Sequence, residues 1–299
     1  MEIDRPQHLF SMYIYENTQA LAQEINMKFQ TTILPLTLVF LLSACGGSGT
    51  NETKVIPDPG GVQPIVGFPE DLQQDLPIPN NQFRNQYSVI LFGNSHVSGL
   101  SDLLTAISQA ALPNVEFKAQ RAPNGQFLDD RLYHLPSVEL ITKNNWSHVI
   151  LQGQKYSQSG AVDYPTLAAQ SWIKLAKNFD TMPILFPEHP QIGNNNEGRL
   201  LQALHLSIAE EEASCVAPIG LAWDRVIELA PSLKLHHIDG NHAALYGSFL
   251  TSLVLFEVIT GVSADLVPFI NGIDIDQQTQ SLLKQVATDT IAANKACEF

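Results

Sequence analysis

The amino-acid sequence predicts an α/β domain in which a doubly wound, mostly parallel sheet of five strands lies between two layers of helices. Short apolar runs alternate with longer amphipathic stretches from residue 87 onward. The apolar runs are continuous, which is typical of strands that are buried on both faces of a parallel sheet. Alternation of strands and helices through right-handed crossovers then gives a three-layer α/β/α sandwich.

Each expected strand is a short apolar run, and each expected helix has apolar residues at helical spacing. The expected strands are 87–92, 115–118, 148–151, 183–186 and 214–217. The expected helices are 98–111, 129–142, 165–178, 197–212, 221–230, 242–260 and 276–296. In such folds ligands bind beyond the carboxyl ends of the strands. We therefore expect the segments that follow the strands to share one edge of the sheet, namely Ser95, 123–126, 152–155 and Glu188-His189.

The N-terminal part of the chain predicts targeting to the cell envelope. Met27 and Lys28 precede a ten-residue apolar core at 33–42, a pattern that is typical of a secretory signal and too short to span a bilayer. The sequence Leu-Ser-Ala-Cys that ends at Cys45 resembles the bacterial lipobox, in which the cysteine is lipidated and becomes the first mature residue. A buried apolar helix that ends in cysteine is the alternative interpretation.

We expect three regions: an N-terminal extension with the lipoprotein signal peptide at 1–44, a flexible tether at 45–85 and the folded domain at 86–299. The tether is rich in Gly, Pro, Asn and Gln. Because the signal begins far inside the chain, either Met27 is the true start or the residues before it are an artefactual extension. Lipid on Cys45 would attach the protein to a membrane of the bacterial cell envelope, and we expect this to be the outer membrane.

The overall composition excludes some classes of function. Lys and Arg number 16 against 30 Asp and Glu, so the net charge of −14 disfavours a nucleic-acid partner. A mean hydropathy near zero argues against a protein that crosses the membrane many times. In an oxidising compartment Cys215 and Cys297 either pair or remain two separately buried thiols, and the sequence leaves both possibilities open.

Two short motifs carry the functional prediction. Gly93-Asn94-Ser95-His96 follows the first expected strand, and Asp239-Gly240-Asn241-His242 precedes a helical segment late in the chain. A serine at the tip of a buried strand, together with Asp-x-x-His, can supply a nucleophile, a base and a carboxylate that orients the base.

Taken together, these positions resemble the SGNH/GDSL hydrolase superfamily over roughly residues 87–262, and most closely its bacterial members of the lipoprotein type. The resemblance implies an SGNH hydrolase-like, flavodoxin-like fold and a serine esterase without a cofactor. It assigns Ser95 as the nucleophile, His242 as the base and Asp239 as the residue that orients the base. The expected substrates are acyl or acetyl esters of carbohydrates or small lipids, with an acyl-enzyme as intermediate.

The resemblance also implies an oxyanion hole made by the backbone N–H groups of Ser95 and Gly125 and by a side-chain amide. Relatives take this amide from an asparagine after the third strand, whereas this chain has Gln152 and Gln154 there. Register favours Gln154 as the third donor and Gln152 is the alternative, because a glutamine amide can donate the same hydrogen bond.

Other interpretations of the same residues remain open. His96 and His189 are expected to be pocket walls or surface residues rather than second bases. The segment from His236 to His242 contains metal-ligand residue types, which makes a metal-binding protein the less favoured alternative. The missing asparagine also allows a catalytically inactive envelope protein that binds a glycan or serves as a scaffold.

Overall fold

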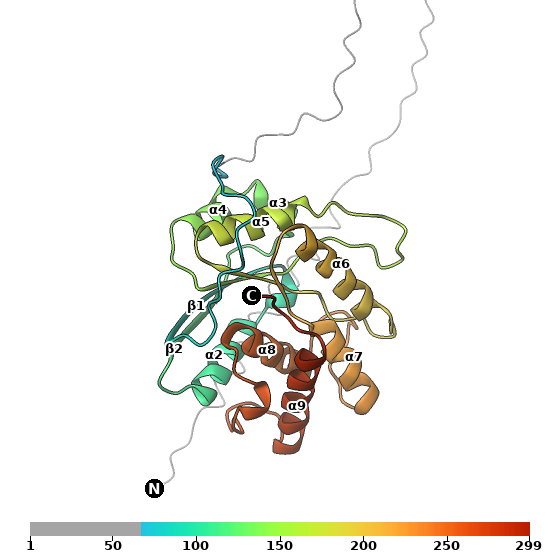
Figure 1. Ribbon diagram of the computed structural model, residues 1–299. Helices are drawn as coiled ribbons and strands as arrows, with labels where there is room; N and C mark the ends of the chain where they lie inside the picture. Colours follow the sequence, from blue (N-terminus) through green and yellow to red (C-terminus); the bar gives the residue numbers. More distant parts are fainter. Residues whose placement is uncertain (1–66) are drawn as a thin grey trace, which may run out of the picture. The chain divides into compact units, whose positions relative to one another are not determined.

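The computed structural model describes residues 67–299 and shows a sheet with helices on both faces (Figure 1). The predicted signal peptide, Cys45 and residues 45–66 of the predicted tether lie outside the described residues.

The sheet has five parallel strands in the order β2-β1-β3-β4-β5. This order confirms the predicted flavodoxin-like, doubly wound topology. The register sets Val89 of β1 opposite His148 of β3. The strands are β1 (Gln86–Phe92), β2 (Glu116–Arg121), β3 (His148–Leu151), β4 (Met182–Leu185) and β5 (Cys215–Val216).

Each face of the sheet has its own apolar core, as the continuous apolar runs predict. Along β1, Val89 and Leu91 join one core while Ile90 and Phe92 join the other. The first core is covered by α2 (Leu100–Ala111), α7 (Ile219–Leu229), α8 (Leu245–Thr260) and α9 (Gln277–Ala293). The second is covered by α3 (Leu128–Leu132), α4 (Leu135–Thr142), α5 (Leu167–Asn178) and part of α6 (Glu197–Glu211). The two layers lie on opposite sides of the sheet in Figure 1.

Two of the differences from the predicted helices have a clear local cause. The helix expected at 129–142 is divided into α3 and α4, because Pro136 lies in the first turn of α4 and cannot continue a helix from α3. The helix expected at 98–111 begins at Leu100, after a short 3-10 helix η1 (Ser95–Val97) and the left-handed Gly99. A second 3-10 helix, η2 (Ala264–Leu266), follows α8. Across residues 67–299 no helix combines the length and apolar content that a membrane span requires.

Residues 67–85 correct the predicted boundary of the tether, because they pack on the domain. The buried Asn81 side chain donates hydrogen bonds of 2.8 Å to the backbone oxygens of Ser147 and Asp180. The Phe83 N–H donates to the Thr260 oxygen at 3.0 Å, and Ile78 joins the apolar core. This segment lacks helix or strand periodicity, yet its polar groups find partners at element ends, so it is part of the fold.

Cys215 and Cys297 form a disulfide, which decides between the two possibilities that the sequence leaves open. The bond joins β5 to the segment after α9. The Val216 N–H also donates to the Ala296 oxygen at 2.7 Å, so the C-terminal segment pairs with the outer side of β5.

Candidate functional site

Ser95 lies where β1 ends and η1 begins, and the preceding Gly93 makes this turn possible. Gly93 has a φ of 153°, and an added Cβ would lie 2.2 Å from Gln152 Oε1. No larger residue fits without displacing that amide. The Asn94 side chain caps η1 by accepting the His96 N–H at 3.1 Å. Ser95 itself is exposed to solvent.

Ser95, His242 and Asp239 form a continuous chain of hydrogen bonds. His242 Nε2 lies 2.8 Å from Ser95 Oγ, and His242 Nδ1 lies 2.7 Å from Asp239 Oδ2. The tautomer that satisfies both contacts carries its proton on Nδ1 and accepts the serine proton at Nε2. The structure therefore brings together the two motifs that the sequence singles out, which are 147 residues apart.

The turn that contains Asp239 fixes both partners of this contact. Asp239 Oδ1 accepts the backbone N–H groups of Asn241 and His242, each at 2.9 Å. Slight burial raises the pKa of Asp239, but these N–H groups and the His242 ring outweigh it and hold the pKa well below its usual range. The carboxylate is consequently ionised at neutral pH and can stabilise a protonated His242.

A buried arginine that sequence reasoning missed links the loops after β1 and β2. Arg131 of α3 is fully buried and donates to the backbone oxygens of Gly93, Pro123 and Asn124. Burial, and then the charge of Arg121, lowers the pKa of Arg131 to about 10, so the guanidinium stays charged at neutral pH. In the sequence Arg131 simply follows two aspartates, Asp129 and Asp130, and nothing there indicates that its side chain is buried between loops.

Gly125 lies beside the Ser95 turn. A Cβ added to Gly125 would lie 3.5 Å from Asn94 Cα and 3.1 Å from the guanidinium of Arg121. Arg121 in turn donates to the Asn94 oxygen at 2.8 Å. Within residues 67–299 the backbone N–H groups of Ser95 and Gly125 donate no hydrogen bond, so both are available to a ligand.

Gln152 and Gln154 are placed differently from the predicted third oxyanion donor. Gln154 donates to the backbone oxygens of Lys155 and Pro165 at 2.9 and 3.1 Å, and it lines a separate cavity of about 300 Å³. Gln152 is completely buried and accepts the Asn94 N–H at 2.8 Å through Oε1, while Nε2 donates to Glu188. The NH₂ groups of both glutamines thus donate to partners other than a ligand at Ser95. A glutamine side chain is also longer by one methylene than the asparagine that relatives have here.

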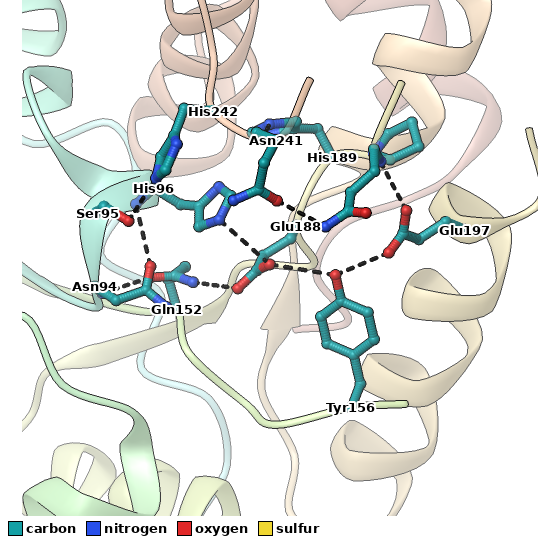
Figure 2. A network of polar contacts seen from close by, with 12 residues as sticks. Asn94, Ser95, His96, Gln152, Tyr156, Glu188, His189, Glu197, Asn241 and His242 are labelled. Carbon is teal, nitrogen blue, oxygen red and sulfur yellow. Dashed lines mark hydrogen bonds and ion pairs between the residues drawn. The ribbon is translucent and has the colours of Figure 1, made fainter. Parts of the chain in front are cut away.

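Behind Gln152 lies a buried network of acidic and phenolic groups (Figure 2). Tyr156 donates its hydroxyl proton to Glu197 Oε1 at 2.9 Å and lies 3.4 Å from Glu188 Oε2. Burial raises the pKa of Glu188 to about 7, although hydrogen bonds from Gln152 and Tyr156 lower it. The sequence places Glu188 after a strand, yet nothing in its neighbours predicts this burial.

His96 and His189 line the site as neutral rings. The His96 ring stacks on His242 with centroids 5.2 Å apart, and the His189 ring stacks on Trp223 at 3.9 Å. Burial lowers the pKa of His96 to about 4 and that of His189 to about 3. Trp223 is fully buried against the His189 ring.

The histidines of the alternative metal interpretation have other partners. His236 Nε2 lies 2.7 Å from the Pro190 oxygen, and His237 Nδ1 lies 3.4 Å from Asp239 Oδ2. In the part of the chain that the structure describes, no three His, Cys, Asp or Glu side chains are grouped so that they could share a metal ion.

No protein-family model matches the sequence, and no curated protein matches it either. Solved structures do share its shape. A DUF4886 family protein from Bacteroides uniformis matches with a TM-score of 0.57 at 13% identity, over 71% of this chain and 97% of its own.

Two further matches have lower TM-scores, each of 0.45. A proposed SGNH hydrolase from Slackia heliotrinireducens is 18% identical and is matched over 56% of this chain and 96% of its own. An acetylxylan esterase from Geobacillus stearothermophilus is 14% identical, over 58% of this chain and 94% of its own. At this low identity, the match to the DUF4886 family protein shows a shared fold, which by itself defines neither substrate nor activity.

Proposed function

We propose that this protein is a serine ester hydrolase whose triad is Ser95, His242 and Asp239. The observation that carries the proposal is the unbroken hydrogen-bond chain from Ser95 Oγ through both nitrogens of the His242 ring to Asp239. An unreactive hydroxyl becomes a nucleophile when an adjacent base accepts its proton and a third group orients that base.

In the proposed reaction Ser95 Oγ attacks the acyl carbon of the ester while His242 Nε2 takes the hydroxyl proton. Collapse of the tetrahedral intermediate breaks the bond to the alcohol oxygen, which receives that proton from His242. An acyl-enzyme on Ser95 remains. Water, deprotonated by His242, then attacks the acyl carbon and releases the acid and free Ser95. Asp239 remains ionised throughout and stabilises the imidazolium.

The developing oxyanion would be held by the N–H groups of Ser95 and Gly125, the two available donors beside the serine. Arg131 fixes the loops that carry them, and Arg121 adds positive charge within reach of Gly125. A single oxyanion donor contributes about 10²–10³-fold to kcat in serine hydrolases. Two backbone donors would therefore still contribute strongly to catalysis, while the lack of a third donor would lower kcat by a factor of this size.

The open position of the triad suits an ester on the outside of a larger molecule. His242 and Asp239 retain 39% and 42% of their side-chain exposure. A cavity of about 490 Å³, lined by residues 190–195 and by His236, His237 and Ile238, adjoins the turn that carries Asp239. We propose acyl or acetyl esters of carbohydrates or small lipids as substrates, with the alcohol portion beside this cavity.

The test compares hydrolysis of p-nitrophenyl acetate by the full-length wild type, Ser95→Ala and Ser98→Ala. Ser98 is an exposed serine three residues away and serves as the matched control. We expect Ser95→Ala to lose activity and fluorophosphonate labelling, while Ser98→Ala keeps both. Equal rates for wild type and Ser95→Ala would reject the serine esterase proposal.

A second candidate is a catalytically inactive binding or scaffold protein, and one observation favours it: neither Gln152 nor Gln154 directs its amide toward Ser95. This candidate predicts that a fluorophosphonate labels no serine in the folded wild type. Labelling at Ser95 alone would exclude it.

We also propose that lipid on Cys45 attaches the protein to the bacterial cell envelope. The lipobox-like sequence supports this, and the Cys215–Cys297 disulfide fits an oxidising compartment. Expression in a bacterial host of the wild type and Cys45→Ser, followed by detergent-phase partitioning and mass spectrometry, tests it. The wild type should partition with detergent and carry acyl mass, and recovery of both proteins in the aqueous phase would contradict the proposal.

A further inference from the structure

The Gln152 side chain packs against the turn that carries Ser95. Its side chain is completely buried, and Oε1 accepts the Asn94 N–H at 2.8 Å. The closeness of Gly93, whose added Cβ would overlap Oε1, leaves that oxygen little freedom. The peptide that precedes the serine therefore depends on the orientation of one buried amide.

The orientation of this amide is in turn determined by Glu188. Since the Asn94 N–H requires an acceptor, Oε1 must face Asn94 and Nε2 must point the other way. There Nε2 meets Glu188 Oε1 (Figure 2). Without an acceptor at this place a buried donor would be unpaired, which favours rotation of the amide away from Asn94.

Glu188 is itself held firmly by groups from several elements. Its Oε2 lies 3.4 Å from the Tyr156 hydroxyl and 3.7 Å from His96 Nε2. Glu197, which accepts the Tyr156 proton, also accepts the Gln191 N–H at 2.7 Å. The charges of Glu197 and His242 also act on the pKa of this carboxyl group. These contacts position the Glu188 carboxyl group so that it can accept the Gln152 amide.

The burial of Glu188 is costly, which argues for a role in the site. Among residues 67–299, no Lys or Arg nitrogen lies within 4.0 Å of this carboxyl, which is 8% exposed. A buried acidic group without a cationic partner lowers the stability of the folded protein. Such groups concentrate where function depends on them.

We propose that Glu188 is a positioning residue for Ser95 and acts through Gln152. Its Oε1 accepts the Gln152 amide, which in turn holds the Asn94 N–H and thereby sets the turn that presents Ser95 to His242. The carboxyl touches neither substrate nor reacting atoms. This role rests on the proposed esterase function and requires an acceptor oxygen, not a negative charge.

Because the proposed role requires only an acceptor oxygen at residue 188, Glu188→Gln and Glu188→Ala should differ in activity. Glutamine still offers an oxygen to Gln152, so Glu188→Gln should stay within about 3-fold of wild-type kcat, whereas Glu188→Ala should lose about 10- to 100-fold with little change in KM. The rate of fluorophosphonate labelling of Ser95 should follow kcat. Glu212→Ala removes another buried carboxylate, paired with Lys177 far from Ser95, and should leave both rates unchanged.

A double-mutant cycle tests whether the effect passes through Gln152. Gln152→Leu should lose activity as Glu188→Ala does, and the double variant should be no slower than Gln152→Leu alone. Multiplicative losses would overturn the proposal, as would an unaffected, folded Glu188→Ala or a Glu188→Gln as slow as Glu188→Ala. Unfolding midpoints of all variants exclude loss of structure as the cause.

The two proposals fail in different ways. Absence of both hydrolysis and Ser95 labelling in the wild type rejects the esterase proposal and, with it, the role of Glu188. Wild-type activity that depends on Ser95 but is indifferent to Glu188→Ala rejects only the positioning role.

Discussion

Ser95 lies between two regions that differ in how they are built. On one side His242 and Asp239 belong to a single exposed turn, in which local N–H groups fix the carboxylate. On the other side Gln152, Glu188, Tyr156 and Glu197 form a buried network drawn from distant parts of the chain. The exposed turn can supply proton transfer, whereas the buried network can supply only position. In such a site the residues that can transfer protons are exposed to solvent, and the residues that position the serine are buried.

The largest expected effect lies in the exposed turn. Asp239→Asn should lower kcat about 10⁴-fold, because an amide at this position favours the wrong tautomer of His242. Thermal stability should change little, since the asparagine side-chain oxygen can still accept the backbone N–H groups of Asn241 and His242. Steady-state kinetics and a melting curve check this, with the exposed Asp289→Asn as control. A loss below about 10-fold would remove Asp239 from the triad.

The Cys215–Cys297 disulfide lies outside both regions and should affect stability without affecting chemistry. Replacing both cysteines by serine should lower the free energy of unfolding by about 4–5 kcal/mol, because the bond closes a loop with a sequence separation of 82. Denaturant unfolding measures this. We expect kcat to be retained under conditions where the variant is folded, and a folded variant without activity would show that the bond reaches the site.

Arg131 links the loops after β1 and β2 beside Ser95, so its replacement should damage both stability and activity. Arg131→Met leaves several buried backbone oxygens unpaired, and we expect a loss of about 2–4 kcal/mol together with a kcat lowered about 10- to 100-fold. The exposed Arg121→Gln is the comparison, with a stability change below about 0.5 kcal/mol. Equal melting temperatures for Arg131→Met and wild type would contradict this account.

Glu188, in the buried network, should lower the free energy of unfolding of the wild type at alkaline pH. The pKa of Glu188 is raised to about 7 in the folded protein, above its unfolded value, so its contribution to stability is present at low pH and is lost as the pH rises through 7. Glu188→Gln should therefore exceed wild-type stability by roughly 1–3 kcal/mol near pH 8 and lose this advantage near pH 4. Unfolding curves across this range check the sign, and an advantage independent of pH would refute it.

The smallest expected effect concerns Gln154, which register favours over Gln152 as the third oxyanion donor. Gln154→Ala should change kcat less than about 3-fold, because its amide is bound to Lys155 and Pro165. A loss as large as that of Gln152→Leu would show that Gln154 turns toward Ser95 when substrate binds.

The same division explains what the sequence could predict. The strands and their parallel arrangement follow from short apolar runs, and backbone topology brings the carboxyl ends of parallel strands together. The pairing of Ser95 with His242 follows instead from the two motifs and the family that they resemble. The Asp239 turn is predictable since its hydrogen bonds join residues three or fewer positions apart.

Long-range pairings could not be predicted in the same way. The burial of Arg131 and Glu188 depends on oxygens and amides contributed by loops that are distant in sequence, and charged residues are ordinarily expected at the surface. The composition of residues 45–85, rich in Gly, Pro, Asn and Gln, predicts a tether, yet Asn81 is anchored by two backbone oxygens of other segments. Side-chain pairing of this type leaves no periodic signal.

The two outermost strands of the sheet are protected against association in different ways. β2 carries exposed charged side chains, Glu116 and Lys118, which discourage another strand from adding to it. β5 is instead covered by the C-terminal segment, through the Val216–Ala296 hydrogen bond and the covalent link at Cys297. Reduction would release that cover and expose an apolar strand with open hydrogen-bonding groups, so the first consequence of a reducing environment should be aggregation through β5.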